Sequence, residues 1–252
     1  MPRRRAPRAQ EKPARATDAP AIRQRFRRAL LRWYARHRRD LPWRHTRDPY
    51  RVLVSEIMLQ QTQVDRVKPK YHEFLERYPT LEALAAADVD DVRRTWYPLG
   101  YNIRPVHLHG IAREAVARYR GRLPEDESGL RSLRGIGRYT AGAVRAFAYG
   151  QRAPILDTNV RRVLGRVFHG GDGRRVPTAA MWRLAELVLP RGDVYDFNQA
   201  LMDFGATWCT AKKPRCLPCP MRRFCRAYPF SERTGRASPP PSRPRRPAKR
   251  AR

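Results

Sequence analysis

Residues 133–141 read Leu-Arg-Gly-Ile-Gly-Arg-Tyr-Thr-Ala, and the fold is most readily predicted from these nine residues. A helix ends, Gly135 and Gly137 form a tight hairpin around a buried Ile136, and a new helix begins at Tyr139. Glycines let a backbone approach a phosphate closely, and the N-terminus of the new helix directs free N–H groups toward it. A Gly-x-Gly pair also occurs in ordinary helix–helix turns, so the stretch predicts a helical hairpin and leaves its ligand open.

Helical patterns dominate on both sides of this hairpin. Apolar residues recur at helical spacing from Ile22 to Tyr34, which predicts a first amphipathic helix. Thr80 is a possible N-cap for a short helix to Ala86. Further helices are predicted over residues 52–62, 68–78, 88–97, 103–119, 127–133, 139–148, 159–167, 179–189 and 195–207. No run of alternating residues with a hairpin turn occurs, so the predicted fold class is all-α.

The predicted helices divide into two lobes. One lobe spans residues 41–153 and contains the hairpin. The other combines an N-terminal helix, residues 21–40, with residues 154–230. Residues 1–20 and 231–252 are rich in Pro, Arg and Ala and almost free of large apolar residues. These two ends are predicted to be disordered basic arms, because they cannot bury enough surface to offset the entropy of ordering.

The charge of the chain predicts a polyanionic partner. The formal net charge is +31, of which +4 falls on residues 1–20 and +7 on residues 231–252, leaving +20 for the body. Such an excess favours nucleic acid over a merely soluble surface, and no long amphipathic basic helix favours an anionic membrane. No apolar run approaches the roughly 18 residues of a membrane span, and the N-terminus lacks the apolar segment of a secretory signal. We expect a monomer, and a cytoplasmic, nucleoid-associated location if the cell is prokaryotic.

All four cysteines lie within seventeen residues, in the pattern Cys209-x6-Cys216-x2-Cys219-x5-Cys225. A secreted disulfide scaffold would spread its cysteines along the chain, so this grouping indicates a metal or cofactor in a reducing compartment. Four thiolates suit either zinc or a [4Fe–4S] cluster, and the spacing leaves both open.

The loop after the first cysteine carries three cations, Lys212, Lys213 and Arg215. Cations on a loop tethered at both ends would form a phosphate clamp. The alternative is an ordinary solvated loop.

Two acidic residues have surroundings that suit catalysis. Glu56 is the only acid between Asp48 and Asp65 and lies among apolar residues, so burial would raise its pKa and make it a usable proton donor or acceptor. Asp157 follows an apolar pair and precedes a predicted helix, where an aspartate is a favoured N-cap. The same carboxylate can cap a helix and still face a reacting group.

These motifs together resemble the adenine DNA glycosylases of the helix-hairpin-helix, or endonuclease III, superfamily. The cysteine spacing is similar to that of the endonuclease III and adenine glycosylase families. The run SEIMLQQTQV at residues 55–64, after LPWR and DPY, is nearly a signature of the adenine glycosylases. WYPLGY at residues 96–101 and FNQALMDFG at residues 197–205 extend the resemblance, which covers about residues 39–225.

The resemblance implies a chemistry and a set of roles. Glu56 would protonate the purine, Asp157 would stabilise an oxocarbenium-like transition state, and Tyr139 would line the site where endonuclease III has its Schiff-base lysine. This implies a monofunctional glycosylase that excises adenine mispaired with guanine or 8-oxoguanine in double-stranded DNA. The cysteines would hold a [4Fe–4S] cluster. The expected DNA contacts are Gln60, Gln61, Thr62, Tyr101, Gly135, Gly137, Lys212, Lys213 and Arg215.

Two alternatives stay open. A thymine or uracil mismatch glycosylase of the same fold shares LPWRHTRDPY-like features and a tyrosine after the hairpin. From a different class, the chain could be a non-catalytic iron–sulfur protein that binds DNA or senses redox state. The presence of both Glu56 and Asp157 argues against that class.

Overall fold

The computed structural model describes residues 20–100 and 103–230. Over these residues the regular elements are all helical, which confirms the all-α prediction. The two predicted basic arms, apart from Pro20, lie outside the described residues, as does Tyr101. None of the described helices is long and apolar enough to cross a membrane.

The helical elements of the described residues follow one another with short connections. In chain order they are α1 (Pro20–His37), η2 (Pro42–Arg44), α2 (Pro49–Met58), α3 (Val64–Arg77), α4 (Leu81–Ala86), α5 (Val89–Trp96), α6 (Ile103–Tyr119), α7 (Glu127–Ser132), α8 (Arg138–Phe147), α9 (Thr158–Leu164), η3 (Gly165–His169), α10 (Thr178–Val188), α11 (Val194–Asp203) and η4 (Phe204–Trp208).

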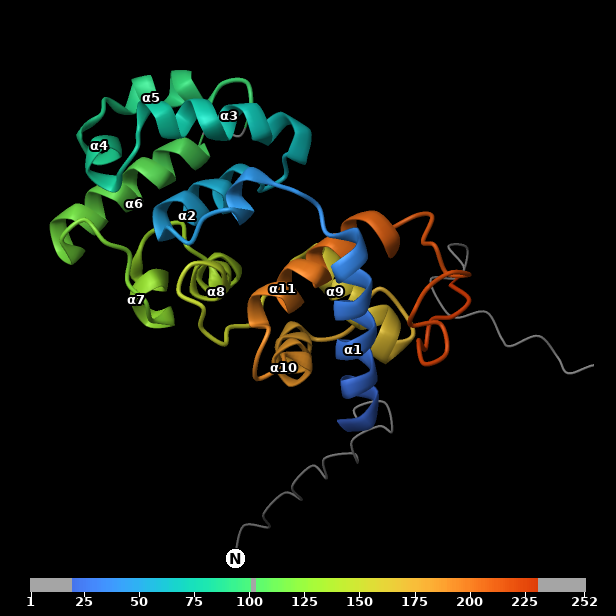
Figure 1. Cartoon of the computed structure of the whole chain (residues 1–252). Helices are drawn as coiled ribbons and strands as arrows, with labels where there is room; N and C mark the ends of the chain where they lie inside the picture. Colours follow the sequence, from blue (N-terminus) through green and yellow to red (C-terminus); the bar gives the residue numbers. More distant parts are fainter. Residues whose placement is uncertain (1–19, 101–102, 231–252) are drawn as a thin grey trace, which may run out of the picture.

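Two groups of helices pack side by side (Figure 1). In the first group α6 packs against α4, α5 and α2, and α2 packs against α8. In the second group α1 packs against α10 and α11, and α9 packs against the same two helices. Contacts between α8 and α11 join the groups. The first helix of the chain therefore lies beside helices that come more than 140 residues later.

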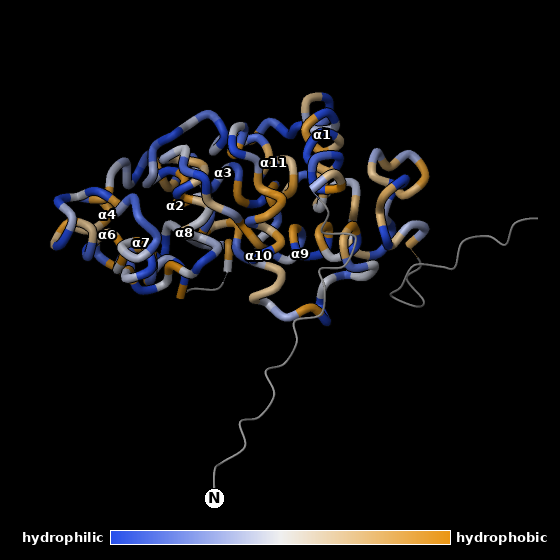
Figure 2. The backbone as a smooth tube through the Cα atoms, turned by 90° about the horizontal axis from the view of Figure 1, so that it is seen from below, coloured by the Kyte–Doolittle hydropathy of each residue, from blue (hydrophilic) through white to orange (hydrophobic). Residues whose placement is uncertain are grey.

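The amphipathic pattern of α1 explains its position. Its apolar residues Phe26, Leu30 and Trp33 are buried, while the arginines between them are exposed or half-buried. Hydrophilic and hydrophobic residues are interspersed along α1 (Figure 2). Phe26 meets Phe168 edge-on at 5.3 Å between ring centroids and Phe197 at 6.1 Å. Burial of each large apolar side chain contributes about 1.5–3 kcal/mol, so this face holds α1 on the second group.

Helix α2 differs from its predicted bounds at both ends. It begins at Pro49, because Asp48 caps the helix by accepting hydrogen bonds from the N–H groups of Tyr50 and Arg51. A proline in the first turn needs no donor, so the Asp-Pro pair starts this helix rather than extending the loop. The helix ends at Met58, and the predicted helical residues 59–62 form a turn instead.

Helix α3 begins four residues before its predicted start, and Pro69 lies inside it. Two other predicted helices end in wider turns. The helix predicted over residues 159–167 becomes α9 followed by η3, and the one predicted over residues 195–207 becomes α11 followed by η4; η3 and η4 are π-helical. Such π-helical turns occur frequently at functional sites. Here η4 leads directly into Cys209, and η3 contacts the same cysteine through Arg166.

Two of the glycines inside predicted helices are explained by close backbone contacts. A Cβ on Gly142 would lie 2.5 Å from the carbonyl oxygen of Pro154. A Cβ on Gly165 would lie 2.3 Å from the backbone nitrogen of Gly173. Another glycine inside a predicted helix, Gly110, has open space where its Cβ would be. Thr80 caps α4 as predicted, accepting from the N–H of Ala83.

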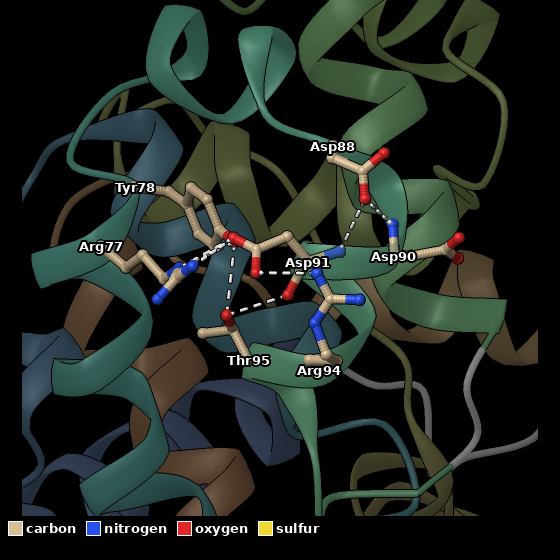
Figure 3. A network of polar contacts seen from close by, with 7 residues as sticks. All are labelled: Arg77, Tyr78, Asp88, Asp90, Asp91, Arg94 and Thr95. Atoms are coloured by element: carbon tan, nitrogen blue, oxygen red, sulfur yellow. Dashed lines mark hydrogen bonds and ion pairs between the residues drawn. The ribbon is translucent and has the colours of Figure 1, made fainter.

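A polar network ties α5 to the end of α3 (Figure 3). Asp91 accepts hydrogen bonds from the side chains of Arg77 and Arg94 and from the Tyr78 hydroxyl, and the Arg77 guanidinium in particular lowers the pKa of Asp91. Asp88 caps α5 through the N–H groups of Asp90 and Asp91 at 3.0 Å. The network fixes the helix that leads into the loop at residues 97–100.

Candidate active site

A cavity of about 700 Å³ lies between the two helix groups. Glu56 on α2, Tyr139 in the first turn of α8 and Asp157 before α9 all line it. A cavity of this size lies in the range of pockets that enclose small organic ligands. The structure thus brings the three predicted catalytic residues together from segments that are far apart in the chain. Other lining residues are Arg39, Leu41, Trp43, Arg44, Leu59, Gln60, Gln61, Thr62, Gln63, Val64, Leu156, Thr158, Asn159, Met202 and Ala206.

The Glu56 carboxyl is buried at the wall of this cavity, with 5% of the residue exposed. Its pKa is raised to about 7, chiefly by burial, and the charge of Asp157 adds to the rise. A hydrogen bond with Tyr139 and the positive charge of Arg44 act in the opposite direction. A carboxyl with a pKa near 7 exchanges its proton readily at neutral pH, which is what a general acid or base requires.

Tyr139 is half-buried and connects the hairpin to the cavity. Burial, followed by the charges of Glu56 and Asp157, raises its pKa well above 10. The phenol therefore keeps its proton at neutral pH, and it also donates a long hydrogen bond of 3.9 Å to the sulfur of Met202. A protonated phenol can donate hydrogen bonds in the site, but it has no amine that could form an imine.

Asp157 is the N-cap of α9, as the sequence predicts. Its carboxylate accepts from the N–H of Val160 at 2.6 Å and from the side-chain amide of Asn159 at 3.1 Å. Burial raises its pKa, and these two donors together with Arg162 oppose that rise. The Val160 N–H holds Oδ1 and the Asn159 amide holds Oδ2, and the residue still lines the cavity. Asp157 can therefore present negative charge to a cation that develops in the cavity.

The turn after α2 presents three of the predicted DNA contacts. Gln60 and Gln61 are exposed and Thr62 is half-buried, and all three line the cavity. Gln61 has a φ of 56°, in the left-handed region that residues other than glycine, asparagine and aspartate rarely adopt. Such strained residues cluster at functional sites, where the surrounding structure holds them in place.

Two arginines that the sequence reading did not single out help to build the cavity wall. Arg44 forms a bidentate pair with the fully buried Asp203, at 2.8 and 2.9 Å, and Arg39 donates to the same carboxylate at 2.7 Å. Burial acts to raise the pKa of Asp203, but the two guanidinium groups outweigh it and leave that pKa below its ordinary value. The pairs tie the segment between α1 and α2 to the end of α11. LPWR and FNQALMDFG contain Arg44 and Asp203, but nothing in either motif indicates that they meet.

The hairpin has the predicted form. Helix α7 ends at Ser132, Gly135 has a φ of 103°, Ile136 is buried and Gly137 is the N-cap residue of α8. A Cβ on Gly135 would approach the His107 side chain to 3.1 Å, whereas the position of a Cβ on Gly137 is open. The N-terminus of α8 is therefore accessible at Gly137, and the same helix carries Tyr139 into the cavity.

The four cysteines line a second, smaller cavity. They are free thiols rather than disulfides. Arg166 on η3 donates a hydrogen bond to Cys209 Sγ at 3.6 Å, and the N–H of Met221 donates to Cys219 Sγ at 3.4 Å. Within the described ranges, no three His, Cys, Asp or Glu side chains are grouped as a site for a single metal ion.

Burial acts strongly on these thiols. It raises the pKa of Cys219 to about 11 and that of Cys225 to about 12, while N–H donors at both residues lower them. Burial also raises the pKa of Cys209, against the opposing charge of Arg166. Thiolates at these positions require a positive partner inside the cavity, which is what the metal centres of a cofactor supply.

A relay of hydrogen bonds links this cavity to the larger one. Asn159, which donates to Asp157, accepts from Arg162 at 2.8 Å, and Arg162 donates to the backbone carbonyl of Cys209 at 2.9 Å. The helix α9 thus has Asp157 at its N-terminal end and contacts the cysteine segment through Arg162. Nearby, Lys212, Lys213 and Arg215 are exposed on the predicted loop.

The chain that forms this helical hairpin, and the cavity lined by Glu56 and Asp157, matches a family of known proteins. A family model described as "HhH-GPD superfamily base excision DNA repair protein" matches residues 54–187. The chain belongs to this HhH-GPD superfamily.

Individual relatives are adenine and thymine/uracil glycosylases. The chain is 46% identical to an adenine DNA glycosylase of Mycolicibacterium smegmatis over 193 residues, which cover 76% of this chain and 66% of that protein. It is 37% identical to a thymine/uracil-DNA glycosylase of Methanothermobacter thermautotrophicus, covering 79% of this chain and 91% of that protein. The structure of a thermostable thymine-DNA glycosylase superposes with a TM-score of 0.78 at 36% identity, covering 83% of this chain and 97% of that one. The chain spans 66% or less of the length of adenine glycosylases that it matches, such as 44% of the mouse protein.

Proposed function

We propose that this protein is a monofunctional DNA glycosylase that excises adenine mispaired with guanine or 8-oxoguanine. The observation that carries the proposal is the cavity in which Glu56, with a pKa of about 7, and Asp157 lie together beside the hairpin. A base inside a duplex cannot reach such a cavity, so the target nucleotide would be flipped out of the helix. The excess of positive charge on the body supplies the attraction for the phosphate backbone. The similarity to adenine DNA glycosylases supports adenine as the base.

The two carboxyls would divide the chemistry between them. Neutral Glu56 donates its proton to the purine, at N7. The bond between C1′ of the sugar and N9 then breaks, and its electron pair leaves with the base. The sugar gains oxocarbenium character, which the ionised Asp157 stabilises. Water adds at C1′, and Glu56 takes up the proton that this water loses.

Tyr139 would make the enzyme monofunctional. A lyase needs an amine to form a Schiff base with the opened sugar, and this position of the cavity holds a phenol. Base release should therefore leave the strand intact. Borohydride trapping should give little covalent complex, and nicking should lag far behind base release.

The cysteine cavity fits a [4Fe–4S] cluster held by Cys209, Cys216, Cys219 and Cys225. Four free thiols line one cavity, and N–H donors from Arg166 and Met221 point at the sulfurs. When bound, the cluster would be a structural centre and would order the loop that carries Lys212, Lys213 and Arg215. We propose these cations as a phosphate clamp. Protein prepared without oxygen should contain about four irons per chain, and stoichiometric zinc without iron would contradict the cluster.

The fold also supports two lobes. We propose that residues 41–153 form one, and that residues 21–40 join residues 154–230 in the other. The packing of α1 against α10 and α11 supports this division. We expect a monomer that works on DNA in the cytoplasm, associated with the nucleoid if the cell is prokaryotic.

One assay separates the candidate substrates. The protein is incubated with duplexes bearing A opposite 8-oxoguanine, A opposite G, T opposite G and U opposite G, and abasic sites are revealed by alkali. We expect cleavage at adenine. Release of thymine or uracil alone would favour the second candidate, a mismatch glycosylase, which the 91% coverage of the thymine/uracil-DNA glycosylase supports. No release from any duplex, with intact DNA binding, would favour a non-catalytic protein.

A further inference from the structure

We propose that Arg104, in the first turn of α6, is a positioning residue that locks the Gln60–Thr62 turn to the helix that carries Glu56. The proposal rests on the proposed function, because that function assigns the turn to DNA contact. The Arg104 residue is 5% exposed, and its two terminal nitrogens donate to six acceptors among the described residues. Those acceptors belong to three different segments.

The first segment is the C-terminal end of α2. Arg104 Nη1 donates to the carbonyl oxygens of Ile57 at 3.0 Å and Met58 at 2.9 Å. The last carbonyls of a helix lack partners within it and carry partial negative charge, so a guanidinium there both satisfies and neutralises them. Ile57 directly follows Glu56. The contact therefore fixes the end of the helix from which the acid projects into the cavity.

The second segment is the turn itself. Arg104 Nη1 donates to the carbonyl of Gln60 at 2.5 Å, and Nη2 donates to Thr62 Oγ1 at 3.0 Å. These two acceptors flank Gln61, whose φ is 56°. A glutamine keeps such a conformation only where neighbouring contacts enforce it. Arg104 supplies such contacts on both sides, and so it holds Gln61 at the edge of the cavity.

The third segment is the loop between α5 and α6. Arg104 Nη2 donates to the carbonyls of Leu99 and Gly100, each at 3.1 Å. The indole of Trp96 donates to the same Gly100 carbonyl at 3.3 Å, and the guanidinium lies 5.3 Å from the Trp96 ring centroid. The network at Asp91 in turn anchors α5 to α3 (Figure 3). The guanidinium therefore joins the turn and this loop into one unit with α2.

Lysine cannot replace this arrangement. A guanidinium presents donors on separate nitrogens in a rigid plane, whereas an ammonium is a single point donor. Arg104→Lys keeps the charge but loses the simultaneous reach to the three segments. The chain offers a matched control in Arg27, which caps the end of α10 by donating to the carbonyls of Leu187, Val188 and Leu189. Arg27→Lys makes the same chemical change at a helix end that the cavity does not include.

The first test measures the free protein. Hydrogen exchange is compared for wild type, Arg104→Lys and Arg27→Lys at temperatures equally far below each midpoint of unfolding. We expect amide exchange over residues 59–62 to accelerate by about tenfold or more in Arg104→Lys and to be unchanged in Arg27→Lys. Exchange in Arg104→Lys within about twofold of wild type would overturn the proposal.

The second test measures single-turnover base release at saturating protein, which separates the chemical step from binding. We expect Arg104→Lys to lose between about tenfold and 100-fold in rate, the scale of a displacement near 1 Å, with the midpoint of the pH profile unmoved. An equal loss in Arg27→Lys would show a general effect on the fold and refute a positioning role. If Arg104→Lys does not fold, Thr62→Val removes one acceptor and should produce the same pattern more weakly; wild-type behaviour in both tests would then refute it. If wild type releases no base at all, the proposed function fails, and the exchange measurement still decides the role of Arg104.

Discussion

Replacing Glu56 by glutamine should abolish base release and yet stabilise the fold above pH 7. Glutamine has nearly the same shape as glutamic acid but cannot donate the proton that the chemistry needs. In the wild-type protein the carboxyl is buried, and burial raises its pKa from 4.5 to about 7. Above pH 7 the folded protein must therefore hold a buried carboxylate, a cost that the glutamine variant does not carry.

The size of the effect follows from the two pKa values. Because the folded state binds the proton more tightly than the unfolded chain, this group's contribution to stability is full below pH 4.5. It falls as the pH rises from 4.5 to about 7. At about 1.4 kcal/mol per pKa unit the whole change is about 3 kcal/mol, and roughly 2.5 kcal/mol of it falls between pH 5 and pH 8. Glutamine does not titrate, so the difference between variant and wild type changes by that amount.

The measurement is urea unfolding of both proteins at pH 5 and pH 8, followed by tryptophan fluorescence. We expect the variant to gain roughly 2.5 kcal/mol on the wild type between the two pH values. Glu76→Gln, on an exposed position of α3, is the matched control and should show no such gain. A Glu56→Gln difference that is the same at both pH values within about 0.5 kcal/mol would refute the buried, proton-holding carboxyl.

Three further outcomes are expected. Tyr139→Phe removes a hydrogen bond that lowers the pKa of the buried glutamate, so the alkaline fall of the single-turnover rate should move to higher pH; a fall that moves to lower pH would contradict the contact. Gly142→Ala should destabilise the protein by about 1–3 kcal/mol in thermal unfolding because its Cβ would meet the Pro154 carbonyl. Gly110→Ala, with open space, should be neutral or stabilising by up to about 1 kcal/mol, and equal effects at the two glycines would show that the overlap is relieved. Asp203→Asn leaves two arginines facing a neutral group and should lower the free energy of unfolding in urea by about 3–5 kcal/mol. A decrease of less than about 1 kcal/mol would contradict this reasoning.

Much of the helical framework could be predicted because it depends on local signals. The predicted bounds of residues 103–119 agree with α6, and residues 127–133 and 139–148 agree with α7 and α8 within one residue. The hairpin between α7 and α8 follows from glycines whose conformations are set within a few residues. Asp157 and Thr80 were predictable as caps for the same reason, since a cap contacts the two or three residues that follow it.

The predicted helix bounds are wrong where contacts with residues distant in the sequence determine the local structure. The apolar pattern of residues 52–62 continues the helical spacing past Met58. The helix nevertheless ends there, and Arg104, more than 40 residues away, donates hydrogen bonds to the carbonyls of its last turn. Pro69 was expected near a helix start, and packing keeps it inside α3 instead. The helix widens to a π-helix at η3, where the backbones of Gly165 and Gly173 lie close together. The spacing of apolar residues within one helix does not predict such a contact.

The candidate site was predictable residue by residue but not as a cavity. Burial of Glu56 was expected from its apolar neighbours, and the structure agrees. The arginines that meet Asp203 were missed because nothing in the sequence relates positions 159 and 164 residues apart. The roles of Glu56, Asp157 and Tyr139 in catalysis, and of the cysteines in holding a cluster, stay predictions that the experiments above address.

The position of α1 also affects how the chain is made. The partners that cover Phe26 come from η3 and α11, so they leave the ribosome about 140 to 170 residues after it. At roughly 5–20 residues per second, the apolar face of α1 waits on the order of 10–30 s for its cover. During that time Phe26, Leu30 and Trp33 are exposed to other nascent chains and to chaperones. A ribosome that stalls before α11 therefore releases a fragment in which the apolar face of α1 is exposed. The fragment also lacks Met202, which lines the cavity. We expect such fragments to be degraded rather than to act on DNA.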